Sequence, residues 1–198
     1  MSSKSSDTSK YIVFGLQRSG TTFTQRVIEM NTKLELDTSV WKHIIPPVDT
    51  CALKVMVTKS PYNWASSIVT RNRVDVLWKW RKYRLRDRGE AMWRDINLEH
   101  LIKLWNDWHN AWIEHDVLHV QYEQLLRDAF TPMKLIGMKS GSQVTLPPSI
   151  DVSTDRFFIP LSRREEYLKH HLNSRVVEQI NRFIDRSLLD KLGYTLVK

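Results

Sequence analysis

The segment from Gly15 to Thr22 has residue types and a spacing that suit the binding of an anion. Its two glycines, Gly15 and Gly20, are separated by four residues, between a short apolar run at 11–14 and a stretch of helical periodicity. A loop of this kind lets successive backbone N–H groups face an anion at a helix N-terminus, where the aligned peptide dipoles add positive potential. The sequence therefore predicts a phosphate-type loop at this junction.

The side chains of this loop argue against an ordinary ATPase or kinase. The loop of those enzymes reads G-x-x-x-x-G-K-[ST], and here Thr21 stands where the lysine should be. The cation is instead Arg18, inside the loop, and the β-type run at 117–120 ends in Gln121 rather than in an aspartate that could hold Mg²⁺. We therefore expect a reaction without a metal ion.

The run Arg18-Ser19-Gly20-Thr21-Thr22 resembles the 5′-phosphosulfate loop of sulfotransferases that use 3′-phosphoadenylyl sulfate (PAPS), among them small soluble bacterial and phage members. The resemblance implies that PAPS is the donor co-substrate and that backbone amides and the hydroxyls of Ser19, Thr21 and Thr22 hold its 5′-phosphate. It also implies that Arg18 stabilises charge on the bridging oxygen as the S–O bond breaks. The alternative is a surface turn with a helix cap.

A second segment resembles the part of these sulfotransferases that binds the donor's 3′-phosphate. The family places a basic residue at a strand end and a serine eight positions later, and Lys59-Ser60-Pro61 with Ser67 match that spacing. Lys59 replaces the commoner arginine, which keeps the charge but not the bidentate geometry. Ser66, one residue earlier, is an alternative to Ser67, and Arg71 is a candidate third contact. Without the resemblance, Ser60 would be a helix cap and Lys59 a solvated side chain.

Sulfuryl transfer to a hydroxyl needs a base, and histidine suits that task near neutral pH. His43 lies in Trp41-Lys42-His43-Ile44-Ile45-Pro46, which resembles the Lys-Thr-His-Leu-Pro segment that carries the base in cytosolic sulfotransferases. The resemblance implies that His43 is the base and that Lys42 assists the leaving phosphate or fixes the acceptor. Other branches of the family use a carboxylate in this interval, so Glu35 and Asp37 stay open.

Strands that alternate with helices must position these residues. The β-type runs at 11–14, 53–58 and 117–120 are each followed by residues with helical spacing. This order predicts an α/β fold, a single P-loop-like domain over 10–198 with a central parallel sheet flanked by helices. The Ser- and Lys-rich residues 1–9 are expected to be a disordered tail.

Further helices are predicted where apolar residues recur at three- and four-residue spacing. The range 97–115 is expected to be an amphipathic helix, with a stripe of Leu101, Trp105, Trp108 and Trp112 in the core. A long loop is expected at 139–154, and helical periodicity returns at 163–193 with a stop at Gly193.

The bulk composition restricts the partners. The 198 residues carry 30 Lys and Arg against 22 Asp and Glu, a formal net charge of +8 that favours anionic ligands. Cys51 is the one cysteine, and no apolar run approaches the length of a membrane span. We therefore expect a cytoplasmic protein with no membrane partner, acting on a small-molecule or glycan acceptor.

The segment 71–88 leaves a second class of function open, because basic residues alternate there with Trp78, Trp80 and Tyr83. Such a segment can line an acceptor cleft or bind nucleic acid by phosphate contact and stacking. A solvated helix with inward aromatic residues is the simplest interpretation, and nucleic acid is not the expected partner. The rival to a sulfotransferase is therefore a basic nucleotide- or nucleic-acid-binding module without catalysis.

Overall fold

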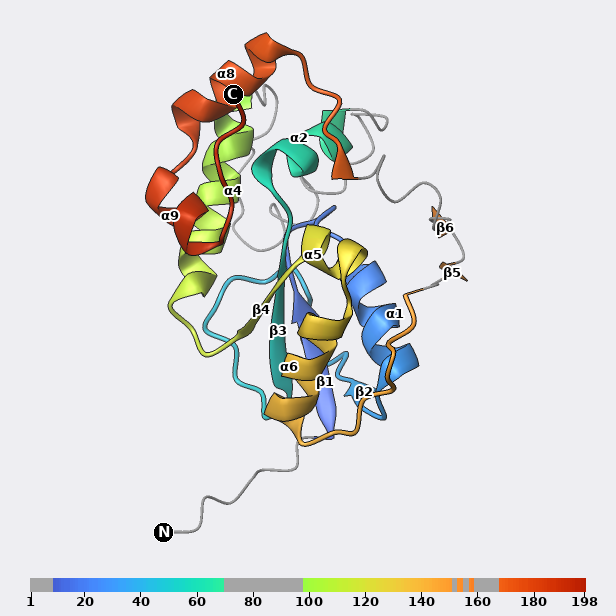
Figure 1. The fold of residues 1–198 in the computed structure, drawn as a ribbon. Coiled ribbons are helices and arrows are strands. Elements are labelled where there is room, and N and C mark those ends of the chain that lie inside the picture. Colours follow the sequence, from blue (N-terminus) through green and yellow to red (C-terminus); the bar gives the residue numbers. More distant parts are fainter. Residues whose placement is uncertain (1–8, 70–97, 151–152, 155–156, 159–167) are drawn as a thin grey trace. The chain divides into compact units, whose positions relative to one another are not determined.

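The computed structural model describes residues 9–69, 98–150, 153–154, 157–158 and 168–198 (Figure 1). These residues form two compact units. The sheet unit contains the described parts of 9–59 and 111–168, and the helical unit contains those of 60–110 and 169–198. Residues 1–8 of the expected tail at 1–9, and the basic segment 71–88, lie outside the described residues.

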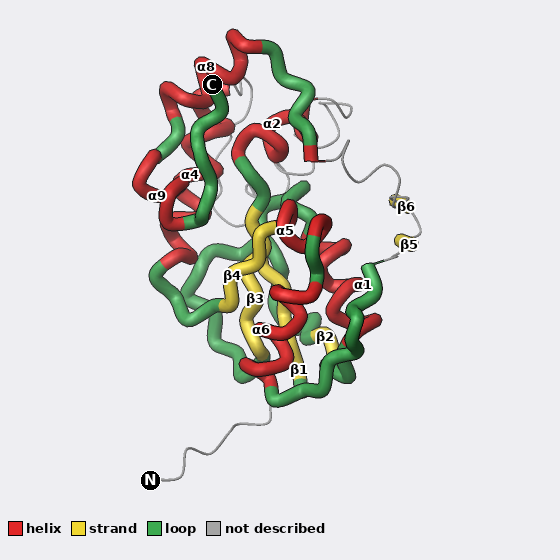
Figure 2. Tube along the Cα trace, viewed as in Figure 1, coloured by secondary structure: helices red, strands yellow, loops and turns green. Residues whose placement is uncertain are grey.

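The sheet unit is built on a four-stranded parallel sheet in the order β2-β1-β3-β4 (Figure 2). Its strands are β1 (Lys10–Phe14), β2 (Glu35–Leu36), β3 (Leu53–Thr58) and β4 (Leu118–Gln121). Three of them coincide with the predicted runs, because continuous apolar and β-branched residues suit a strand that is covered on both faces. The predicted α/β class with a central parallel sheet is confirmed.

Helices α1 (Thr21–Asn31), α5 (Tyr122–Arg127) and α6 (Phe130–Ser140) share one hydrophobic core with the sheet. Alternate strand residues such as Tyr11, Val13 and Val55 enter that core. Successive side chains of a strand point to opposite faces, so Phe14 faces the other way. There its ring stacks on Trp112, with ring centroids 4.4 Å apart. Both faces of the central strands are therefore covered.

Asn31 ties the segment after α6 to the end of α1. Its side-chain Nδ2 donates to the carbonyl of Ser149 at 2.6 Å, and its Oδ1 accepts from the Ser149 amide at 2.6 Å. The Thr145 amide donates to the Asn31 carbonyl at 2.9 Å. Helix α1 thus ends at a residue that also holds part of the predicted loop at 139–154 in place. Two short antiparallel strands follow, β5 (Ser153–Thr154) and β6 (Phe157–Phe158).

The helical unit contains α2 (Pro61–Val69), most of α4 (Leu98–Ile113), α8 (Ser174–Phe183) and α9 (Arg186–Lys191). Side chains of Asn173 and Asp185 cap α8 and α9 by accepting from Val176 and Leu188 amides. The predicted stripe on α4 is buried, which confirms its assignment to the core. Within the described ranges, no helix has the length and apolar character needed to cross a bilayer.

Candidate functional site

The predicted phosphate loop lies between β1 and α1 and has the backbone of an anion cradle. Arg18 has a φ of 75° and Gly20 a φ of 94°, while Ser19 between them does not take a positive φ. Alternation of this kind turns neighbouring N–H groups toward one side of the chain and forms a concavity for anions. The amide of Ser19 donates to the Leu16 carbonyl at 3.0 Å, and its hydroxyl donates to the same oxygen, which fixes the turn.

The first turn of α1 adds to this cradle. Gly20 is the N-cap residue and supplies no side-chain hydrogen bond, so the early amides of the helix keep the donor capacity that a capping side chain would use. Thr21 is buried and Thr22 is exposed. The amides of this turn and the helix dipole together suit a bound anion.

The candidate base lies directly against the loop. The amide of Gly15 donates to the Lys42 carbonyl at 3.1 Å, and the ring of His43 is bonded through Nδ1 to the Gly15 carbonyl at 2.5 Å. A carbonyl oxygen can only accept, so Nδ1 carries the proton and Nε2 keeps its lone pair. Lys42 reaches the loop as well, because its Nζ donates to Thr22 Oγ1 at 3.1 Å. Both predicted residues of this segment therefore meet the predicted loop.

Burial lowers the pKa of both of these side chains. Loss of solvent lowers the pKa of His43 to about 4, with the neighbouring ammonium of Lys42 acting in the same direction and the Gly15 carbonyl opposing it. Burial also lowers the pKa of Lys42. At neutral pH the imidazole is therefore unprotonated and able to accept a proton.

Aromatic residues hold the segment that carries His43. The indole Nε1 of Trp112 donates to the Ile44 carbonyl at 3.0 Å, and the amide of Ile44 donates to the Trp41 carbonyl at 3.1 Å. The ring of Trp41 meets that of His43 edge to face at a centroid distance of 5.2 Å, and 37% of Trp41 is exposed. The candidate base is thus fixed by its neighbours rather than held on a free loop.

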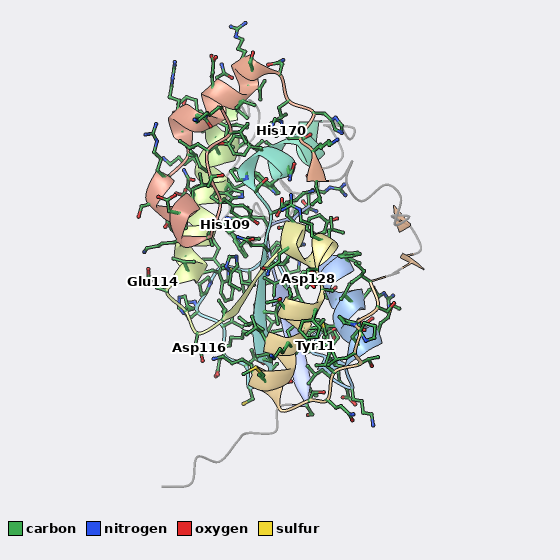
Figure 3. The ribbon with its side chains drawn as sticks, viewed as in Figure 1. Tyr11, His109, Glu114, Asp116, Asp128 and His170 are labelled. Carbon is green, nitrogen blue, oxygen red and sulfur yellow. The ribbon has the colours of Figure 1, made fainter. Side chains whose placement is uncertain are left out.

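The carboxylates left open as bases lie at the opposite end of the first strand. The amide of Asp37 donates to the carbonyl of Tyr11, which is labelled in Figure 3, at 2.8 Å. Glu35 pairs with Lys10 in the sheet. At about 3.3 Å per residue, the four residues from Tyr11 to Gly15 span roughly 13 Å of strand. Hydrogen bonds from Ser39 lower the pKa of Asp37 below its ordinary value. The geometry favours His43 over both carboxylates.

The residues expected at a 3′-phosphate fall in two units. Lys59 follows β3 in the sheet unit, and its Nζ lies over the ring of Tyr122, 5.0 Å from the centroid. In the helical unit, Ser60 Oγ accepts from the Asn63 amide at 3.2 Å, so Ser60 is a helix cap, and Ser67 Oγ donates to the Trp64 carbonyl at 2.7 Å. Ser66 Oγ accepts from the His171 amide at 3.2 Å. Arg71 lies outside the described residues.

Tyr122, which packs against Gly20 of the loop, and His119 of β4 are two residues that the sequence did not single out. Tyr122 lies so close to Gly20 that a Cβ added there would meet its ring carbon Cδ2 at 2.2 Å. His119 Nε2 is 2.6 Å from Thr58 Oγ1, and burial lowers the pKa of His119 to about 4. The signal for Tyr122 was its place directly after β4, at the edge where parallel sheets of this kind gather functional residues, whereas His119 lies within β4.

The end of β4 carries Gln121, which pairs with Thr58 of β3 in the sheet. Among the residues that the structure describes, no three His, Cys, Asp or Glu side chains gather in a way that could hold a metal ion. Comparison of the chain with protein-family models and with curated proteins found no match. The geometry of the loop and of the Lys42 and His43 segment therefore carries the functional argument.

Proposed function

We propose that this protein is a sulfotransferase that moves a sulfuryl group from PAPS to a hydroxyl or amine acceptor. One observation carries the proposal: His43 and Lys42, which are remote in sequence from the loop, bind Gly15 and Thr22 of that loop. A phosphate-type loop alone indicates that an anion binds, but not which reaction follows. A neutral imidazole fixed beside it, with Nε2 able to accept a proton, supplies what transfer to a hydroxyl requires.

The residues of the loop fit the donor's 5′ end by their chemistry. The first turn of α1, which follows the alternating backbone at Arg18 to Gly20, offers amide donors to phosphate oxygens, and the hydroxyls of Thr21 and Thr22 lie in the same turn. Arg18 and Lys42 bring two positive charges to this part of the chain. When bound, the donor supplies an activated sulfur atom attached to phosphate through a bridging oxygen.

The proposed reaction is a direct displacement. His43 Nε2 takes the proton of the acceptor while the acceptor oxygen or nitrogen forms its bond to sulfur. The bond from sulfur to the bridging oxygen breaks, and its electron pair stays on the phosphate, where Arg18 and Lys42 stabilise the negative charge. The products are the sulfated acceptor, adenosine 3′,5′-bisphosphate and a proton that His43 returns to solvent.

The same proposal covers the 3′-phosphate of the donor, the acceptor and the cellular compartment. Lys59 would bind the 3′-phosphate and supply the charge that distinguishes PAPS from a nucleotide with a 5′ group alone. The acceptor would be a small molecule or a glycan, nucleic acid would not be a partner, and the protein would act in the cytoplasm.

Incubation with ³⁵S-labelled PAPS and a panel of sugars, glycans, phenols and amines tests the proposal. Transfer of label to an acceptor, together with a rise in melting temperature caused by adenosine 3′,5′-bisphosphate and not by ATP with Mg²⁺, is the expected result. The rival function is a nucleotide- or nucleic-acid-binding module without catalysis. Stabilisation by the bisphosphate with no transfer to any acceptor, in wild type and His43→Ala alike, would favour that rival.

A further inference from the structure

Tyr122 lies where three parts of the sheet unit meet. It is the first residue of α5, directly after β4, and is 5% exposed. Its ring covers Gly20, where any Cβ would meet ring carbons at 2.2 and 2.5 Å. The ring of Phe23 meets it edge to face at a centroid distance of 5.7 Å. Tyr122 is therefore packed against the loop and the first helix rather than pointing to solvent.

The parallel register places Lys59 beside the same ring. Thr58 of β3 is paired with Gln121 of β4, so the residues that follow, Lys59 and Tyr122, leave the sheet side by side. The Lys59 Nζ lies 5.0 Å from the Tyr122 ring centroid, within the distance at which a cation is attracted by the negative face of an aromatic ring. One ring thus contacts both the glycine of the loop and the candidate phosphate-binding cation.

We propose that Tyr122 is a positioning residue that holds Lys59 next to the phosphate loop. A lysine side chain loses rotamer freedom when it grips a ligand, and a ring that already restricts it reduces that loss on binding. The loop amides and the Lys59 ammonium would then act together on one nucleotide that carries two anionic groups. This inference rests on the proposed function for the identity of that nucleotide, not for the contact itself.

A purely structural role makes a different prediction, because a packing residue affects binding whether or not Lys59 is present. A double-mutant cycle separates the two. Tyr122→Leu should weaken binding of adenosine 3′,5′-bisphosphate about threefold, the change that a cation–π contact of ordinary strength gives, and Tyr122→Phe should stay within about twofold of wild type. In a Lys59→Met background, Tyr122→Leu should add no further loss. An equal loss in both backgrounds would overturn the proposal.

Fluorinated phenylalanine at position 122 keeps the ring shape while weakening its negative face, so it replaces Tyr122→Leu if that variant does not fold. The expected result is the same loss of affinity, again only when Lys59 is present. Retention of full affinity by the fluorinated protein would overturn the cation–π explanation.

Proton NMR tests the contact without any ligand. The ε-methylene protons of Lys59 should be shifted upfield by the ring in wild type and Tyr122→Phe, and should move to ordinary positions in Tyr122→Leu. Ordinary positions in wild type would overturn the proposal. If wild type binds inorganic pyrophosphate but not the bisphosphate, with the same double-mutant pattern, the proposed function fails and the role of Tyr122 stands. Binding of neither anion would overturn both.

Discussion

The imidazole of His43 donates a hydrogen bond from Nδ1 to the carbonyl oxygen of Gly15 at a distance of 2.5 Å, and this bond decides which ring nitrogen can act as a base. With the proton fixed on Nδ1, Nε2 is the nitrogen that remains able to take a proton from an acceptor. Gly15 is also the residue at which β1 passes into the phosphate loop. The hydrogen bond therefore couples the orientation of the candidate base to the position of the anion cradle.

Replacement of His43 by alanine should remove most of the turnover and leave donor-product binding close to wild type. The loop and Lys59 hold the nucleotide in this scheme, whereas His43 acts on the acceptor. Loss of a general base typically costs about 10²- to 10⁴-fold in rate, or roughly 3 to 5 kcal/mol of transition-state stabilisation. Initial rates with labelled PAPS and calorimetry with adenosine 3′,5′-bisphosphate measure the two effects separately.

The carboxylates provide the matched comparison for this experiment. Asp37→Asn and Glu35→Gln should keep nearly full activity, because these residues pair with the start of β1 and not with its end. If His43→Ala retains more than about a tenth of the rate while either carboxylate variant does not, the base is a carboxylate.

Replacement of Lys59 by alanine should weaken adenosine 3′,5′-bisphosphate more than adenosine 5′-phosphate. Two phosphate groups need two separate sources of positive potential, and the loop supplies the one for the 5′ group. Titration calorimetry on both nucleotides measures the difference, with Lys59→Arg as the control that keeps the charge. The assignment to the 3′-phosphate is wrong if affinity for the bisphosphate is unchanged, or if both nucleotides lose affinity equally.

Much of the sheet could be predicted because its strands are continuous apolar runs, and Lys10–Phe14, Leu53–Thr58 and Leu118–Gln121 agree with the prediction within one residue. The strand Glu35–Leu36 has only two residues, too few for a periodic signal. Helix α6 was partly hidden by Pro132 and Gly137, which are usually helix breakers. Pro132 lies in the first turn, where its missing N–H costs little, and Gly137 lies close to Val144.

The site was only partly accessible from the sequence. The loop and the segment with Lys42 and His43 were predicted as separate motifs, but their contact depends on how the chain between Asn31 and Leu53 folds back. The pairing of Lys59 with Tyr122 follows only from the register of β3 and β4, which the sequence does not specify. Contacts of this kind come from tertiary structure and leave no local periodicity.

Chelators should leave the transfer reaction intact. The proposed charge stabilisation comes from Arg18, Lys42 and the N-terminus of α1, and β4 ends in Gln121 rather than in a carboxylate that would hold Mg²⁺. Turnover with labelled PAPS should be the same before and after dialysis against EDTA. A loss of activity that a divalent ion restores would falsify the metal-free mechanism.

Replacement of Gly20 by alanine should destabilise the sheet unit and abolish anion binding. Alanine at a φ of 94° is strained, and its Cβ would meet the Tyr122 ring at 2.2 Å. Left-handed backbone costs about 1 to 2 kcal/mol and overpacking about 1 to 3 kcal/mol, so a loss of roughly 2 to 5 kcal/mol in the free energy of unfolding is expected. Urea denaturation measures it, with Thr22→Ala as the exposed control in the same loop. Equal stability of the two variants would contradict the close packing of Tyr122 on Gly20.

The free energy of unfolding should fall as the pH is lowered from about 6.5 toward 4, and His43 should be one cause. Burial lowers the pKa of folded His43 to about 4, while the unfolded side chain has its ordinary value of 6.5. Between these values the unfolded state binds the extra proton, so stability rises with pH across this window and is lost as the pH falls through it. One such group contributes at most about 1.4 kcal/mol per pH unit. His119, whose pKa burial also lowers to about 4, should act in the same direction.

Urea titrations at several pH values between 4 and 7 separate this effect from the packing role of the ring. His43→Gln removes the titrating group, so its stability should depend less steeply on pH than that of wild type, whatever its stability at pH 7. The slope is the informative quantity, because loss of the bond to Gly15 or of packing lowers stability equally at every pH. His119→Gln should flatten the slope in the same way, and the double variant should be flatter than either single one. Parallel curves for wild type and His43→Gln would mean that His43 titrates alike in the folded and unfolded states. The imidazole would then not be held neutral by burial beside the loop.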